Sequence, residues 1–306
     1  MQVKADQAGA KNDSSADPLA EALTEQSRLW PEVRTESRKL EPGWITAEAF
    51  FAADAAIDEY LDYEGSFHAG ADRRTCAASM MIDYCYVFSM ATVPLFVGFG
   101  IVPELTPQHY AMRFYIAPQE HDGRTFQIRR AHVRFLSRAF WTDKKVSAAH
   151  PDARGLPNRD ALCDLYRHSV EDHVRPLIDK LASRTGLSRN ALWRLVSDAV
   201  AGRFLDAGRR LGCLEEAKAM AMTILKQSGS PLNNRQLHYF DLTLRDDGER
   251  ELISWAFRAR GGCCRYYTVE GGELCDTCVL KKPEERDAEL LEIMRHRFAA
   301  AAGNRS

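Results

Sequence analysis

The chain has no marked excess of charge of either sign. Its 306 residues include 41 lysines and arginines and 43 aspartates and glutamates, for a formal net charge of -2. A protein that follows a phosphodiester backbone needs a broad positive field, which this composition does not provide. Hydrophobic residues make up 45% of the sequence and charged residues 27%, as in ordinary globular proteins. We therefore expect a globular protein that binds no nucleic acid.

The N-terminus lacks the features of an export signal. Residues 1–18 are small and polar, and no apolar segment follows a basic start. We expect residues 1–44 to form a mostly disordered N-terminal extension. A protein that is not exported stays in the cytoplasm, where thiols are reduced and clustered cysteines bind metals more often than they form disulfides.

Long hydrophobic runs are also scarce. Residues 84–103 carry no charge and are long enough to cross a bilayer. However, Pro94 interrupts this stretch, and its polar side chains and glycines suit a membrane poorly. The pattern predicts a buried core helix that ends near Pro94 and no transmembrane span, and it leaves a peripheral membrane contact open.

Several common catalytic signatures are missing. The segment Gly98-Phe-Gly-Ile-Val-Pro103 begins like a dinucleotide fingerprint but has proline where the third glycine belongs. His168 and His173 are not four residues apart and have no H-E-x-x-H context, which favours packing or surface positions over metal ligation. The sequence contains no repeat at a solenoid period. It therefore predicts no nucleotide site.

Hydrophobic periodicity predicts an α+β fold that is mainly helical, with a strand pair in the N-terminal half. Helices are expected at residues 18–30, 46–63, 76–93, 160–182, 188–211, 215–227, 249–260 and 283–301. Strands are expected at residues 109–116, 125–136 and 237–244. Residues 45–250 would form the body, with a polar, proline-containing link and candidate hinge at 141–158. A small cysteine-rich module at 251–282 and a charged helical tail at 283–306 would follow.

Arginines gather in the second predicted strand. The members are Arg124, Arg129, Arg130, Arg134 and Arg138. Such a group suits an anionic ligand, although a solvated strand face is the commoner explanation. We therefore treat Arg129, Arg130 and Arg134 only as a weak candidate for attracting a negatively charged substrate.

The eight cysteines fall into two sets. Cys76, Cys85, Cys163 and Cys213 are scattered and are expected to be buried side chains. The other four lie within sixteen residues, as the adjacent pair Cys263-Cys264 and the C-x2-C pair Cys275 and Cys278. Gly271-Gly272 between the pairs lets the backbone fold back. The four sulfurs can thus meet at one site, where a metal would relieve their mutual repulsion.

Spacing alone leaves three kinds of site open for these cysteines. Zinc sites are common in cytosolic proteins, but their ligands usually come as C-x2-4-C pairs, and the adjacent pair departs from that pattern. A reversible disulfide is available to the C-x2-C pair, although no thioredoxin-like context surrounds it. A 2Fe-2S cluster needs four thiolates and spans more space than one ion, so adjacent cysteines are acceptable.

The arrangement C-C-x10-C-x2-C resembles the C-terminal signature of the FhuF family of ferric-siderophore reductases. Weaker likenesses occur in the segments that begin at Arg74, Pro94, Ala191 and Arg203, so that the resemblance covers roughly residues 45–282. It implies that Cys263, Cys264, Cys275 and Cys278 bind a 2Fe-2S cluster and that the protein reduces siderophore-bound Fe(III). It also favours hydroxamate siderophores as substrates.

This resemblance, together with the missing nucleotide site, predicts an external electron donor such as a ferredoxin or a flavin reductase. Outer-sphere electron transfer requires no acid–base dyad or nucleophile, so no catalytic residue beyond the cluster is expected. Arg265, beside the adjacent pair, is a candidate for favouring the reduced cluster by its charge. A non-redox binding protein with a structural zinc site, or an iron–sulfur redox sensor, would carry the same cysteines.

Overall fold

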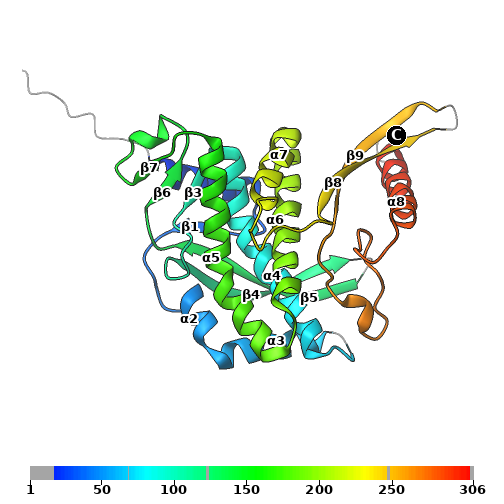
Figure 1. Cartoon of the computed structure of the whole chain (residues 1–306), viewed down its shortest axis with the longest axis horizontal. Helices are drawn as coiled ribbons and strands as arrows, with labels where there is room; N and C mark the ends of the chain where they lie inside the picture. Colours follow the sequence, from blue (N-terminus) through cyan, green and yellow to red (C-terminus); the bar gives the residue numbers. More distant parts are fainter. Residues whose placement is uncertain (1–16, 68, 122–123, 247–248, 304–306) are drawn as a thin grey trace, which may run out of the picture.

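The computed structural model describes residues 17–67, 69–121, 124–246 and 249–303. It confirms a mainly helical fold with small sheets, since 52% of it is helical. The helices are α1 (Pro18–Leu29), α2 (Ala47–Ala52), α3 (Asp54–Ser66), α4 (Arg73–Pro94), α5 (Arg159–Thr185), α6 (Arg189–Leu211), α7 (Leu214–Leu225) and α8 (Pro283–Gly303). Helices α4 to α7 gather into one body, whereas α8 lies apart beside a hairpin (Figure 1).

Three sheets accompany the helices. The largest has the order β1-β5-β4-β2, with β1 (Thr35–Ser37), β2 (Ile45–Thr46), β4 (Tyr110–His121) and β5 (Arg124–Phe135). The predicted strand pair is confirmed as the antiparallel hairpin β4–β5, in which Tyr110 faces Phe135. A second sheet joins β3 (Ile101–Pro103), β6 (Phe140–Thr142) and β7 (Ala153–Gly155), and the third is the hairpin of β8 (His238–Arg245) and β9 (Glu251–Ala259).

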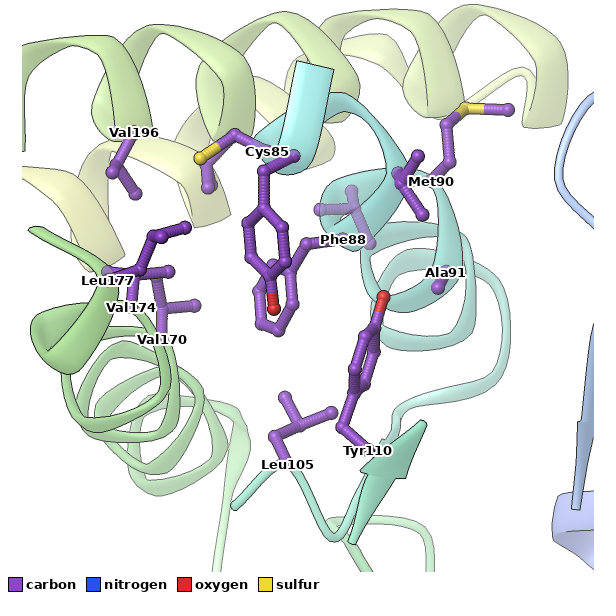
Figure 2. Packing of buried hydrophobic residues seen from close by; sticks show 14 of the residues in the cluster. Cys85, Phe88, Met90, Ala91, Leu105, Tyr110, Val170, Val174, Leu177 and Val196 are labelled. Atoms are coloured by element: carbon purple, nitrogen blue, oxygen red, sulfur yellow. The ribbon is translucent and has the colours of Figure 1, made fainter. Parts of the chain in front are cut away.

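Helix α4 is the centre of the core. Asp72 caps it by accepting a hydrogen bond from the Thr75 N–H, and a π-helical turn at Leu95–Phe99 continues it beyond Pro94. Arg73–Phe99 is the one helix in the described part of the chain that is long and apolar enough to cross a membrane, and 78% of its most apolar window is buried. Figure 2 shows Phe88 of this helix between Tyr110 and the α5 residues Val170 and Val174. The expectation of a core helix is confirmed.

A buried histidine joins three elements of this core. His173 on α5 is fully buried; its Nδ1 lies 2.6 Å from the Leu105 carbonyl and its Nε2 lies 2.5 Å from the Tyr84 hydroxyl. Because a carbonyl only accepts, Nδ1 carries the proton and Nε2 accepts from Tyr84. Burial lowers the pKa of His173 to about 4. The residue therefore serves packing, as expected.

Two predicted boundaries in the N-terminal half are corrected. Residues 17–44 are not disordered, because α1 places Leu19, Ala22 and Leu23 in the core and β1 pairs with β5; residues 1–16 lie outside the described part. The helix expected at 46–63 is divided at Ala53 into α2 and α3. Its capping residue is confirmed, since the Thr46 hydroxyl accepts from the Ala49 N–H.

Two further predictions are corrected where short strands form. The segment 141–158 is not free of regular structure, because β6 and β7 in it complete a sheet with β3. The helix predicted at 249–260 is wrong: this segment is strand β9. Its Ile253, Trp255 and Phe257 alternate with smaller or polar residues, a period of two that is typical of a strand.

Candidate metal centre

The cysteine segment follows β9 and is held against the helical body. The Glu270 N–H donates to the Ala69 carbonyl just before α4, and Arg265 bonds Asp72 and Thr75 at the start of that helix. In Figure 1 the segment loops past the end of the hairpin at which β4 stops and β5 starts, before the chain enters α8. The cysteines thus lie where α4, α6 and this hairpin approach one another.

Asp198 of α6 anchors the start of the segment. Its two carboxylate oxygens accept hydrogen bonds from the Gly261 N–H at 2.8 Å and the Gly262 N–H at 3.0 Å, and from Arg260 Nε at 3.3 Å. Asp198 is only 3% exposed. A side chain at Gly262 would press against the backbone of α6, with a Cβ 3.0 Å from Leu195 N. The two glycines therefore permit the close approach that this carboxylate requires.

Two turns bring the cysteine pairs together. Arg265 adopts a left-handed conformation with φ of 62°, and its N–H lies 3.4 Å from Cys263 Sγ. Gly271 has φ of 70°, and the Cys278 N–H donates to the Cys275 carbonyl at 2.9 Å. The fold-back expected at Gly271 is confirmed.

The four sulfurs share one electrostatic environment. All eight cysteines of the chain are free thiols. A hydrogen bond from Cys275 lowers the pKa of Cys264 to about 5, because it stabilises the thiolate against the opposing effect of burial. The same bond and burial raise the pKa of Cys275. Burial also raises the pKa of Cys263, and the charges of Cys264 and Cys278 act in the same direction. Among the four clustered cysteines, Cys264 is thus the one whose thiolate form is favoured.

The four thiols are the number of donors that a 2Fe-2S cluster takes. In the described part of the chain, no three His, Cys, Asp or Glu side chains are grouped closely enough to hold a single metal ion. Cys264 and Cys275 are in contact, whereas Cys263 and Cys278 are linked to them through longer-range electrostatics. A 2Fe-2S cluster takes four thiolates, two on each iron, and so suits a wider set of sulfurs.

Arg260 is a functional candidate that the sequence reasoning missed. Its Nη1 lies 3.3 Å from Cys275 Sγ while its Nε contacts Asp198. Although burial opposes its charge, Asp198 and the sulfurs of Cys275 and Cys264 raise the pKa of Arg260. The alternation of β9 could have indicated Arg260, because it places Arg258 and Arg260 on one face of the strand. A helix predicted at 249–260 does not place them so.

The role expected of Arg265 is corrected. Its guanidinium donates to Asp72 at 2.8 Å and to Thr75 at 3.2 Å, away from the sulfurs. Only its backbone N–H reaches a cysteine. Arg265 therefore fastens the segment to α4, and Arg260 supplies the side-chain cation at the thiols.

The arginines of β5 do not form an open anion site. Arg134 is buried and paired with Glu36 at 2.6 Å and Glu41 at 3.2 Å. Arg129 packs over Tyr63 and lies 3.6 Å from Glu59, while Arg130 lies 3.8 Å from Asp83. Because acidic residues of the same chain face these three arginines, the structure does not support a role for them in attracting a negatively charged substrate.

A cavity of about 310 Å³ opens beside Cys264. Glu64 and Asp83 line it together with the aromatic side chains of Tyr63, Phe67 and Tyr266. Burial, followed by the charge of Asp83, raises the pKa of Glu64 to about 8, and burial raises the pKa of Asp83 to about 6. Glu64 Oε1 is buried without a hydrogen-bond partner. Arg129 also lines the cavity, and Arg130 lies 3.8 Å from Asp83, so both signs of charge are present at this side of the cysteine segment.

Comparison with known proteins points to the same cysteine segment as the functional site. Residues 260–280 match the family model described as the FhuF 2Fe-2S C-terminal domain. No curated protein and no solved structure matches the chain. The match includes all four clustered cysteines, together with Arg260, Gly261 and Gly262. Residues 260–280 are thus similar to the FhuF 2Fe-2S C-terminal domain, which supports a relation to that family and indicates a 2Fe-2S cluster as the cofactor.

Proposed function

We propose that this chain is a ferric-siderophore reductase. It accepts one electron from an external donor and passes it to siderophore-bound Fe(III), releasing Fe(II) for the cell. The observation that carries this proposal is the FhuF 2Fe-2S domain match at a segment whose cysteines are free thiols. The proposal takes as substrate a hydroxamate siderophore, which the family resemblance favours, and it includes a ferredoxin or flavin reductase as donor and a cytoplasmic location.

In this proposal Cys263, Cys264, Cys275 and Cys278 hold the cluster. The bound cluster supplies one-electron redox chemistry, which matches the reduction of one Fe(III). The protein positions the thiolates: Asp198 fixes the start of the segment, and Arg260 holds a positive charge at Cys275 Sγ. The division into a body at 45–250, a cluster module at 251–282 and a tail at 283–306 belongs to the same proposal.

Reduction leads to release because the two oxidation states of iron differ in ligand preference. Siderophores hold Fe(III) through hard, anionic oxygens, and these suit Fe(II) much less well. A single electron therefore weakens the complex. No acid–base residue is needed for this step, and the protein contributes placement and potential.

Metal analysis of the purified protein tests the cofactor. Protein isolated without oxygen should be reddish-brown and contain two irons and two labile sulfides per chain, with a visible spectrum that dithionite bleaches. Colourless protein with one zinc would contradict the proposal and support a structural zinc site.

A ferrozine trap assay tests the reaction. With a supplied reductant, the wild type should speed the release of Fe(II) from a ferric siderophore, whereas Cys275→Ser should not. Cys213→Ser is the matched control, because Cys213 caps α7 outside the cluster segment. Coloured wild-type protein that leaves the release rate unchanged would point to a redox sensor instead.

A further inference from the structure

A second cavity, of about 430 Å³, lies beside the cysteine segment. It opens between α4, α6 and β9. Its lining includes Tyr86, Arg203, Arg209, Trp255, Arg258 and Arg260. Four guanidinium groups thus gather at one hollow in a chain that is slightly acidic as a whole.

The acidic residues of this cavity are already occupied. Both carboxylate oxygens of Asp198 accept hydrogen bonds, from Gly261, Gly262 and Arg260. Asp206 pairs with Arg203 at 3.2 Å and with Arg209 at 3.6 Å. With four arginines against two aspartates, the lining keeps a formal surplus of positive charge.

Two of these arginines keep a buried donor atom without an acceptor. Arg258 donates to the backbone carbonyl of Asp198, but no carboxylate among the described residues pairs with it. The Nε atoms of Arg203 and Arg258 are buried without a hydrogen-bond partner. Burial lowers the pKa of both side chains. A buried guanidinium without its full set of acceptors is costly, and an anion in the cavity would offset that cost.

The backbone of α6 makes room for this arrangement. Gly202 lines the cavity, and a Cβ at this position would collide with the guanidinium of Arg258. Arg209 lies over the half-exposed Trp255 ring, 4.3 Å from its centroid, and Arg203 lies 5.0 Å from the Tyr86 ring. Planar aromatic walls beside guanidinium groups suit a ligand that carries aromatic rings and negative oxygens.

The cavity reaches the proposed cluster. Arg260 forms part of its wall and contacts Cys275 Sγ at 3.3 Å. Thr277, which stands between Cys275 and Cys278, also lines it. A ligand in this hollow would therefore lie against residues that touch or adjoin the cysteines, on a short path for an electron.

We propose that this cavity binds the substrate and selects ferric chelates that carry net negative charge, such as tris-catecholates. This inference rests on the proposed reductase function. Three singly charged hydroxamates neutralise Fe(III), whereas three doubly charged catecholates leave a strongly negative complex. The surplus of arginine charge favours the anionic complex over the neutral one that the family resemblance favours.

Binding of redox-inert gallium complexes tests the site without requiring turnover. Titration calorimetry on the iron-loaded protein would compare a gallium tris-catecholate with a neutral gallium tris-hydroxamate. We expect the catecholate complex to bind at least about tenfold more tightly and to weaken as salt is added. Arg209→Gln and Arg203→Gln should each reduce catecholate binding by about tenfold. Arg189→Gln, which removes an exposed arginine on α6, is the matched control and should change nothing.

Each variant must retain the iron content and visible spectrum of the wild type, so that lost binding reports the cavity and not misfolding. Equal binding of the two complexes, or binding that neither variant weakens, would overturn the proposal. Fe(II) release with arginine-independent binding would leave the reductase function standing and remove this site. Arginine-dependent binding without Fe(II) release would keep the site as an anion-binding cavity and remove the reductase function.

Discussion

The four cysteines of the helical body and the four of the C-terminal segment have the same side chain in opposite surroundings. Cys85 on α4 is fully buried among apolar residues, and burial alone raises its pKa (Figure 2). Burial likewise raises the pKa of Cys163 to about 11. Cys264, by contrast, receives hydrogen bonds and lies near Arg260, and its pKa is lowered to about 5. Donors and positive charge thus stabilise one thiolate in the cysteine segment, whereas the apolar core around Cys85 and Cys163 opposes ionisation.

The two regions also differ in how the backbone is held. The body is built of capped helices whose apolar faces meet in one core. The cysteine segment contains only a short 3₁₀ turn, Tyr266–Thr268, and depends on Asp198, Asp72 and Ala69 of the body for its position. The body is therefore expected to fold by burial of apolar surface, whereas the segment is ordered by specific polar contacts.

The largest contrast should come from exchanging cysteines in the two regions. Cys264→Ala should abolish the visible spectrum and nearly all bound iron, because it removes a thiolate from the proposed site. Cys85→Ala should retain two irons per chain and lose about 1 kcal/mol of stability through a small cavity in the core. Iron analysis and urea unfolding measure the two effects. Full iron content in Cys264→Ala would contradict the assignment of Cys264 as a cluster ligand and of Cys85 as a core residue.

The second-largest effect is expected from the contacts that hold the cysteine segment against the helical body. Asp198→Asn removes the charge that Gly261, Gly262 and Arg260 share, and we expect a loss of about 3 kcal/mol in the free energy of unfolding. Asp179→Asn, at a half-exposed ion pair with Arg189, should cost less than about 1 kcal/mol. Denaturant unfolding compares them. Similar losses in the two variants would show that the anchor is no more important than a surface pair.

A buried histidine of the helical body should make the free energy of unfolding depend on pH. His173 has a pKa lowered to about 4 in the fold, against about 6.5 when unfolded. The unfolded state therefore binds the proton first as the pH falls. The stability from this residue is complete above pH 6.5 and is lost toward pH 4, by up to about 3 kcal/mol.

His173→Gln, which keeps a donor for Leu105 and an acceptor for Tyr84, isolates this effect. The difference in unfolding free energy between the variant and the wild type should change with the sign just described between pH 6.5 and 4. Glu64 and Asp83 remain in both proteins, and their titration therefore largely cancels in this difference. A difference that stays constant with pH would contradict the assignment of a neutral, buried histidine.

The smallest expected effect separates two arginines of the segment. Arg260→Gln should lower the reduction potential of the cluster on the order of 60 mV, because the reduced state loses a positive charge beside Cys275 Sγ. Arg265→Gln should shift the potential much less, since its guanidinium faces Asp72. Spectroelectrochemistry on both variants measures the shifts. A larger shift for Arg265→Gln would reverse the roles assigned here.

Sequence patterns predicted the helices of the body closely because each has a strong local signal. In the structure Ser188 and Thr46 cap α6 and α2 with their side chains, and Gly186 and Gly212 end α5 and α6. Strands β1, β6 and β7 are not predicted, because three-residue strands have little periodicity and depend on partners far along the chain. Strand β9 differs from them: its alternation is a local signal for a strand, and the helix predicted there is wrong.

By itself, the sequence determined the cysteine quartet, its spacing and the resemblance to the FhuF family, since those features are local and need no partner. Only the tertiary structure decided that Asp198 holds the segment, that Arg260 and not Arg265 faces the thiols, and that the β5 arginines are paired internally. The physical reason is separation along the chain. Electrostatic contacts join residues tens to hundreds of positions apart, and no local pattern records which charge will meet which partner.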